Sequence, residues 1–197
     1  MHGTGTTSGH GSQGSSWPHG YNAIAGGGGG GDNCGGGGGG EYGTPALTPH
    51  VFFGGAGGGS GIDACRNVRA GNGGGIVLVR ANNLVRESGG MITSDGGRSY
   101  NRADGNYHNG YRVNTGFSGG GGAGGSIYIT VDDTLTVNGP TVLTRANPGS
   151  GESGAVWGVQ VGGNGGQGRT RIEYATKRGP GSLGDAPTPY RAGPQRR

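Results

Sequence analysis

The sequence predicts an all-β or irregular fold. We expect stacked short strands, arranged as a β-helix-like stack or a sandwich, with packed extended polyglycine segments and almost no helix. Three observations support this prediction. Glycine makes up 56 of the 197 residues and is gathered in runs. Short apolar, β-branched segments follow these runs and repeat along the chain. No stretch shows the sustained 3.6-residue periodicity of an amphipathic helix.

The longest glycine run, residues 26–40, reads GGGGGG-DNC-GGGGGG, and looser runs occupy 54–59, 71–75, 119–125 and 162–168. Such a run is either a flexible linker or an extended segment of the polyproline II type, with three residues per turn. Extended segments that lie side by side can pair N–H with C=O between neighbours. The clustering of the runs beside β-repeats favours ordered packing. Collagen is excluded, because no Gly-X-Y period is sustained.

An internal repeat follows the glycine-rich region. Residues 76–84 (IVLVRANNL) match 127–135 (IYITVDDTL), and the same offset pairs Met91 with Val142 and Thr93 with Thr144. A third, partial copy is the glycine run that precedes 169–174 (RTRIEY). Repeats at this spacing indicate stacked supersecondary units. The strands expected between Asn/Asp or Gly turns are 76–80, 83–87 and 90–94, then 127–131, 134–138 and 141–145.

The composition leaves little material for an ordinary core. Leu, Ile, Val and Phe account for 28 of the 197 residues, below the roughly 20% at which disorder is suspected, although the net charge is low. Backbone packing would therefore have to supply the stabilisation that apolar side chains do not provide. We expect three parts: a low-complexity N-terminal segment (1–25), a glycine-rich β-repeat and polyglycine domain (26–175), and a basic Arg/Pro-rich C-terminal tail (176–197).

The net charge of +4 is concentrated at the C-terminal end, where residues 169–197 hold seven basic and two acidic side chains. Arginine suits interface pairing with carboxylates. We expect this region to dock onto another copy of the chain or onto a fibre or tail protein, with a solvated terminus as the alternative and nucleic acid as an unfavoured partner. The predicted assembly residues are Arg169, Arg171, Arg178, Arg191, Arg196 and Arg197.

Two cysteines, Cys34 and Cys65, would close a loop of about thirty residues if they were bridged. The chain-entropy model gives such a bridge roughly 3–4 kcal/mol of stabilisation. Two free thiols remain the alternative, but a chain so poor in apolar side chains gains most from the bridge. No histidine lies at ligand spacing from the cysteines, so the sequence predicts no metal site and no cofactor.

The richest polar and aromatic segment is 98–118, RSYNRADGNYHNGYRVNTGFS. Long loops on a rigid scaffold commonly carry binding, and Tyr and Asn supply contact area with adaptable hydrogen bonds. The alternative is that these tyrosines cover a sheet edge. The candidate recognition residues are Tyr100, Asn101, Arg102, Asp104, Asn106, Tyr107, His108 and Tyr111.

The sequence contains no HExxH or P-loop pattern and no other catalytic signature that would support an enzymatic function. Asp132 and Asp133 lie in a predicted turn between strands, and since adjacent strand residues point to opposite faces, they make a poor acid–base pair. The sequence therefore predicts a non-enzymatic protein. It also predicts no membrane insertion, because no apolar run has transmembrane length and the N-terminal segment lacks a signal-peptide core.

The glycine runs, the broken GGAGGG and the aromatic-polar segments between them resemble the distal tail-fibre adhesins of T-even-type phages. The unit GGAGGSIYITVDDTLTVNG is also similar to the glycine-rich β-repeats of large bacterial surface proteins. The resemblance covers about residues 26–175. It implies a phage tail-fibre or tail-tip component, located on a virion or at an extracellular or cell surface. Such a component would bind a host surface glycan or outer-membrane protein. The alternative is a self-assembling structural subunit of an extracellular filament or coat.

Overall fold

The computed structural model describes residues 39, 47, 50–58, 70–99, 107–108, 111–112, 119–151 and 163–184. This part of the chain contains no helix and is rich in strands, so the predicted all-β class is confirmed for it. The predicted disulfide of Cys34 and Cys65 lies outside the described residues.

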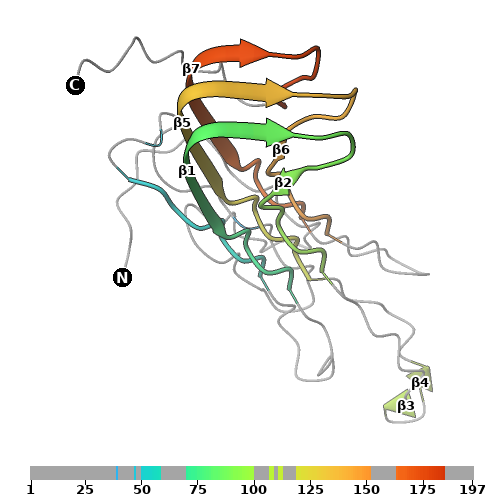
Figure 1. Cartoon of the computed structure of the whole chain (residues 1–197). Helices are drawn as coiled ribbons and strands as arrows, with labels where there is room; N and C mark the ends of the chain where they lie inside the picture. Colours follow the sequence, from blue (N-terminus) through green and yellow to red (C-terminus); the bar gives the residue numbers. More distant parts are fainter. Residues whose placement is uncertain are drawn as a thin grey trace.

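Two parallel sheets form three stacked layers (Figure 1). The larger sheet has the order β1-β5-β7, with β1 at Ile76–Arg86, β5 at Ser126–Val137 and β7 at Arg169–Arg178. The smaller sheet pairs β2 (Ile92–Thr93) with β6 (Thr144–Arg145). We call residues 70–99 layer 1, residues 119–151 layer 2 and residues 163–184 layer 3. Each layer starts with a glycine-rich segment that leads into a long strand and then a turn, as the predicted repeat requires.

Layer 3 extends the smaller sheet without a strand of its own. The backbone N–H groups of Leu143 and Thr144 donate to the carbonyls of Ser182 and Leu183 at 3.0 and 3.2 Å. The third, partial copy of the repeat therefore stacks as a full layer, and β7 pairs with β5 from Ser126–Arg169 onward.

The predicted turn inside each copy is wrong: β1 and β5 each continue through it as one strand. In β5, Asp132 and Asp133 together lie opposite the single residue Asn82 of β1 and the single residue Ala175 of β7. This is a β-bulge, which bends a strand and strengthens its twist. The bend is plain in all three long strands of Figure 1.

The constant repeat offset is also wrong in part. The bulge changes the register within the sheet, so that Ile76 pairs with Ser126 while Leu84 pairs with Leu135. The turn of layer 2, residues 138–143, is one residue longer than the turn of layer 1, residues 87–91. Ile92 therefore pairs with Thr144, so the pairing in the smaller sheet does not follow the offset that aligns Met91 with Val142 in the sequence.

The side-chain core lies between the two sheets and is centred on layer 2. Alternate residues of β5 point inward, and Ile127, Ile129 and Leu135 are each 0% exposed. Ile172 of β7 and Leu143 complete this core from the neighbouring elements. This alternation is the usual pattern of a strand with one buried face.

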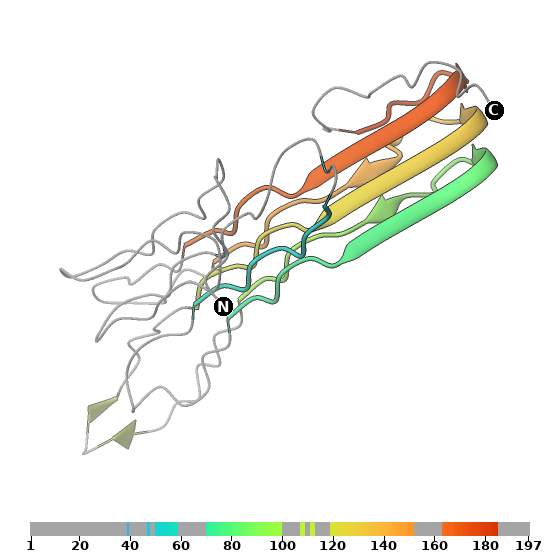
Figure 2. The same ribbon diagram turned by 90° about the vertical axis from the view of Figure 1, so that its left-hand side faces the viewer.

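Glycine-rich segments continue the strands of each layer away from the sheets (Figure 2). We call the described segments 54–58, 70–75, 94–99, 119–125, 146–151 and 163–168 the glycine bundle. Segment 119–125 is buried throughout. Its backbone N–H groups donate to three different neighbouring segments in turn, and the order repeats after three residues. The donor and acceptor pairs are Gly120 to Gly58, Gly121 to Gly163 and Gly122 to Gly97, then Ala123 to Gly55, Gly124 to Gly166 and Gly125 to Ser94, at 2.8–3.0 Å.

The neighbouring segments lie too close together for side chains. A Cβ built at Gly121, Gly122 or Gly124 would come closer than 3.0 Å to backbone atoms of another segment. Among the described residues, positive φ occurs at Leu47 and at four glycines outside the bundle. Glycine is therefore needed in the bundle for close approach between backbones rather than for a left-handed conformation.

Candidate recognition site at the end of the glycine bundle

The strands lie at one end of the glycine bundle, and the chain leaves and re-enters the bundle at the other end. There Gly57 N donates to Gly71 O at 2.9 Å, and Gly120 N donates to Gly58 O at 2.9 Å. Ser99 N donates to Ser150 O at 3.1 Å. These bonds hold together the points from which residues 59–69, 100–118 and 152–162 depart. We call this the connecting end of the bundle.

The predicted recognition segment begins and ends next to buried residues of the glycine bundle. Ser99 is 2% exposed, and Gly119 and Gly120 are buried. Gly122 N donates to Gly97 O at 2.9 Å, so the two segments that carry the loop are themselves hydrogen-bonded. Any residues displayed between 99 and 119 are therefore anchored on a packed scaffold, as binding loops on rigid elements usually are.

Within this segment the structure describes two short strands. In the antiparallel pair, Tyr107 of β3 (Tyr107–His108) lies opposite Arg112 of β4 (Tyr111–Arg112), and His108 lies opposite Tyr111. The hairpin brings three predicted recognition residues onto neighbouring strands. The other candidates, Tyr100, Asn101, Arg102, Asp104 and Asn106, lie outside the described residues.

Sequence reasoning missed this hairpin, although a signal was present. The two residues between β3 and β4 are Asn109 and Gly110. Asn-Gly is the preferred pair for a two-residue hairpin connection, because both positions require φ above zero. A search for turn dipeptides within the polar segment would have found the hairpin.

The arginines predicted to form an assembly tail are divided by the structure. Arg169 and Arg171 lie in β7, and Arg169 is only 6% exposed. Arg178 is exposed at the end of β7 and pairs in register with Thr136. Arg191, Arg196 and Arg197 lie outside the described residues.

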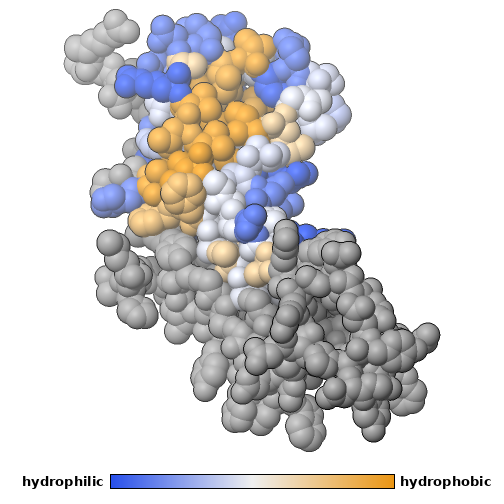
Figure 3. Space-filling view, turned by 90° about the horizontal axis from the view of Figure 1, so that it is seen from below, coloured by the Kyte–Doolittle hydropathy of each residue, from blue (hydrophilic) through white to orange (hydrophobic). Residues whose placement is uncertain are grey.

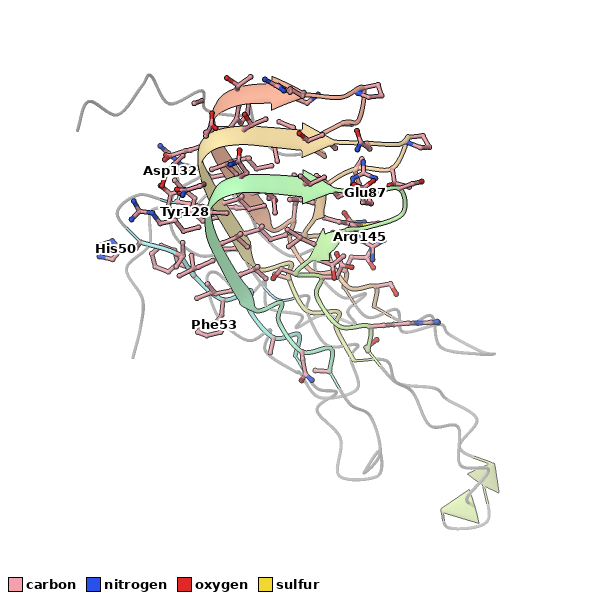
Figure 4. The ribbon with its side chains drawn as sticks, viewed as in Figure 1. His50, Phe53, Glu87, Tyr128, Asp132 and Arg145 are labelled. Atoms are coloured by element: carbon pink, nitrogen blue, oxygen red, sulfur yellow. The ribbon has the colours of Figure 1, made fainter. Side chains whose placement is uncertain are left out.

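Polar and aromatic groups on the outer face of the large sheet contact one another. The Arg171 guanidinium lies 5.7 Å from the centre of the Tyr128 ring and donates from Nε to Glu173 Oε1 at 2.7 Å. Arg80 pairs with Asp132 at 3.6 Å. Figure 4 shows Tyr128 and Asp132 on the same side of the large sheet. Arg171 and Glu173 form an ion pair, and their side chains are only 17% and 14% exposed. This cluster therefore has a structural role on the outer face of the sheet.

A second ion pair links layers 1 and 2 where the short strands end. Arg145 donates to both carboxylate oxygens of Asp95, and the backbone N–H of Asn147 donates to Asp95 Oδ1 at 2.9 Å. The hydrogen bond from Arg145 and the charge of Asp95 raise the pKa of the Arg145 guanidinium above its usual value. The ion pair therefore holds segments 94–99 and 146–151 together.

The described residues contain no group of three metal-ligating side chains. They also include no helix long and apolar enough to span a membrane. In comparisons with protein-family models, curated proteins and solved structures, nothing matches this chain. Function must therefore be argued from the geometry of the chain itself.

Proposed function

We propose that this chain is a non-enzymatic recognition protein, and most simply a component of a phage tail fibre or tail tip that binds a host surface. The observation that supports this proposal is the arrangement of the connecting end. Three segments, 59–69, 100–118 and 152–162, depart from one end of the glycine bundle, opposite the sheets. A rigid body from which several connecting segments depart at one end is suited to present them to a surface.

We propose further that the glycine bundle is a packed array of polyproline II-type segments. The N–H groups of residues 120–125 donate hydrogen bonds to three neighbouring segments, in an order that repeats every three residues. A helix with three residues per turn places its N–H groups in this way. Packing of this kind would make the bundle stiff without a side-chain core, and the three layers would form a β-helix-like stack at its other end.

The expected ligand is a host surface glycan or an outer-membrane protein, and the expected location is a virion or an extracellular surface. Tyr107, His108 and Tyr111 would supply part of the contact area, since they lie on paired strands within the segment that departs from the connecting end. Aromatic rings give large contact at a low cost in conformational entropy.

A binding experiment on intact bacterial cells tests this proposal. The labelled chain is offered to a panel of bacteria and purified outer-membrane glycans, and then Tyr100, Tyr107 and Tyr111 are replaced together by alanine. We expect binding to fall at least about tenfold while the fold is retained, because each lost aromatic anchor typically costs more than about 1 kcal/mol. The matched control is Thr176→Ala with Lys177→Ala, two exposed positions on β7, which should leave binding unchanged. Equal binding by the tyrosine variant and the wild type would contradict the proposal.

The second candidate function is a self-assembling structural subunit of an extracellular filament or coat. One observation favours it: layer 1 leaves apolar side chains exposed at one end of the stack. A filament subunit would bind none of the cells in the panel, and electron microscopy of the purified chain would show polymers.

A further inference from the structure

The two ends of the layer stack differ in how well their side chains are covered. In layer 2 the inward-facing Ile129 and Leu135 are 0% exposed. Their counterparts in layer 1, Val79 and Leu84, pack against the same core but are only half-buried. The apolar interior of the stack is therefore open to the outside at layer 1.

Further apolar side chains near layer 1 are exposed. Figure 3 shows a continuous apolar surface on the underside of the stack, where layer 1 lies. Phe53 is 66% exposed, Leu78 63%, Val85 56% and Met91 38%. Scattered single apolar residues are normal on a protein surface, but a contiguous patch marks an interaction site. We call this surface, made by β1, β2 and the four exposed residues, the layer 1 face.

The opposite end of the stack is closed. Ile172, which β7 contributes to the core, is 1% exposed although β7 has β5 as its one paired neighbour in the described chain. Thr170 and Leu183 of the same layer are 5% and 8% exposed. Layer 3 therefore does not offer a free apolar face on which another layer could stack.

The backbone of β1 is also available at the open end. Ser126 N donates to Gly75 O, which places alternate peptide groups of β1 toward β5 and those of Leu78 and Arg80 toward the open edge. Exposed edges are usually protected by inward-pointing charges, Pro or Lys. Here the nearest charged side chain, Arg80, pairs with Asp132 instead. β1 contains neither Pro nor Lys, so its open edge has little of this protection apart from Arg80.

We infer that the layer 1 face binds a second copy of this chain, face to face, across a two-fold axis. The layer 1 face exposes apolar side chains that belong to the core of the stack. Elsewhere in this chain, a neighbouring layer of the same kind covers the equivalent side chains. The contact would bring two copies of β1 together edge to edge, whereas layers 1 and 2 are related by parallel stacking. A head-to-tail polymer would need layer 3 to be open, and layer 3 is closed. A two-fold contact requires only one surface, and it buries no acidic group from β1 or β2.

This inference does not depend on the proposed recognition function, because it concerns the end of the molecule remote from the connecting end. It differs from the assembly expected from the sequence, since the docking surface lies on layer 1 and not on the basic C-terminal region. Failure of cell binding would leave it intact, and a monomeric chain could still bind cells.

Sedimentation velocity on the full chain tests the inference at concentrations from about 0.1 to 100 micromolar, the range in which contacts of ordinary affinity form. We expect a species of twice the 19.3 kDa chain mass. The double variant Val79→Lys with Ile92→Lys should be monomeric at every concentration, because it would bury four lysines in the contact. The control Thr176→Lys, exposed on β7 at the closed end, should remain dimeric.

Amide exchange on the wild-type chain provides a readout that does not depend on the folding of any variant. Exchange of the β1 amides should slow as the concentration rises, while exchange in β7 should not change. A wild-type monomer at all concentrations overturns the inference. So does a polymer that grows without limit, which would indicate head-to-tail stacking, or a folded double variant that still forms the dimer.

Discussion

Segment 119–125 and strand β5 follow one another in the chain, and both lie in the interior, but they are packed by opposite means. β5 fills its surroundings with side chains such as Ile127 and Ile129, each 0% exposed. Segment 119–125 is also buried, although its only side chain is the methyl group of Ala123. Its contacts with the neighbouring segments are therefore made by backbone atoms. A buried backbone must satisfy its N–H and C=O groups, and here neighbouring segments satisfy them. A chain with few apolar residues can thus extend its ordered interior without more side chains.

The clearest way to break the bundle is to add a side chain where two backbones meet. Gly122→Val would place a Cβ closer than 3.0 Å to the carbonyl of Asn72. Overpacking ordinarily costs about 1–3 kcal/mol, and we expect more than about 3 kcal/mol here because backbone atoms cannot rotate away. Thermal or urea unfolding measures the loss.

Gly75 provides the matched control for this substitution. A Cβ at Gly75 meets nothing within 4 Å, so Gly75→Val should change the free energy of unfolding by no more than about 0.5 kcal/mol. Equal effects at Gly122 and Gly75 would mean that the bundle tolerates side chains and is not close-packed.

The strand half of the molecule should respond to the removal of side chains. Ile129→Ala leaves a cavity in the core of layer 2 and should lower the free energy of unfolding by about 2–5 kcal/mol. Truncation at an exposed position of β7, Thr176→Ala, should cost about 0.5 kcal/mol or less. Chemical denaturation compares the two, and a small loss at Ile129 would show that the side-chain core contributes little.

A smaller effect is expected at Arg86, where a long side chain joins layer 1 to the turn of layer 2. Arg86 is 5% exposed and donates to Thr141 Oγ1 at 2.6 Å and to Thr141 O. Arg86→Met keeps much of the volume but leaves these acceptors without their donor, which should cost about 1–3 kcal/mol. Arg80→Met, at a side chain that is 80% exposed, is the control and should be near neutral. If the two variants have equal midpoints of unfolding, the contacts of Arg86 do not stabilise the stack.

The sequence alone predicted the larger features of this fold because they follow from periodicity. The absence of helix in the described part, the strands behind the glycine runs and the third, partial copy at 169–174 all correspond to the structure. Each depends on a pattern of apolar and glycine residues that the backbone must follow.

Other features depended on information that a repeat alignment does not contain. The bulge at Asp132–Asp133 was interpreted as a turn, because Asp is a common turn residue and a bulge has no such sequence signal here. The partners of each glycine segment could not be predicted, since glycine has no side chain to record which neighbour it contacts. The buried position of Arg86 had no signal either, because arginine is usually exposed.

The central claim is that the glycine bundle is an ordered interior held by its own backbone. Amide exchange, followed by NMR on a chain labelled at glycine nitrogen, tests this claim most directly. The donors Gly120, Gly121, Gly122 and Gly124 each bond to a neighbouring segment, so their exchange should be slowed as strongly as that of the β5 amides. Exchange of these glycines at unfolded-chain rates, with β5 still protected, would contradict the account.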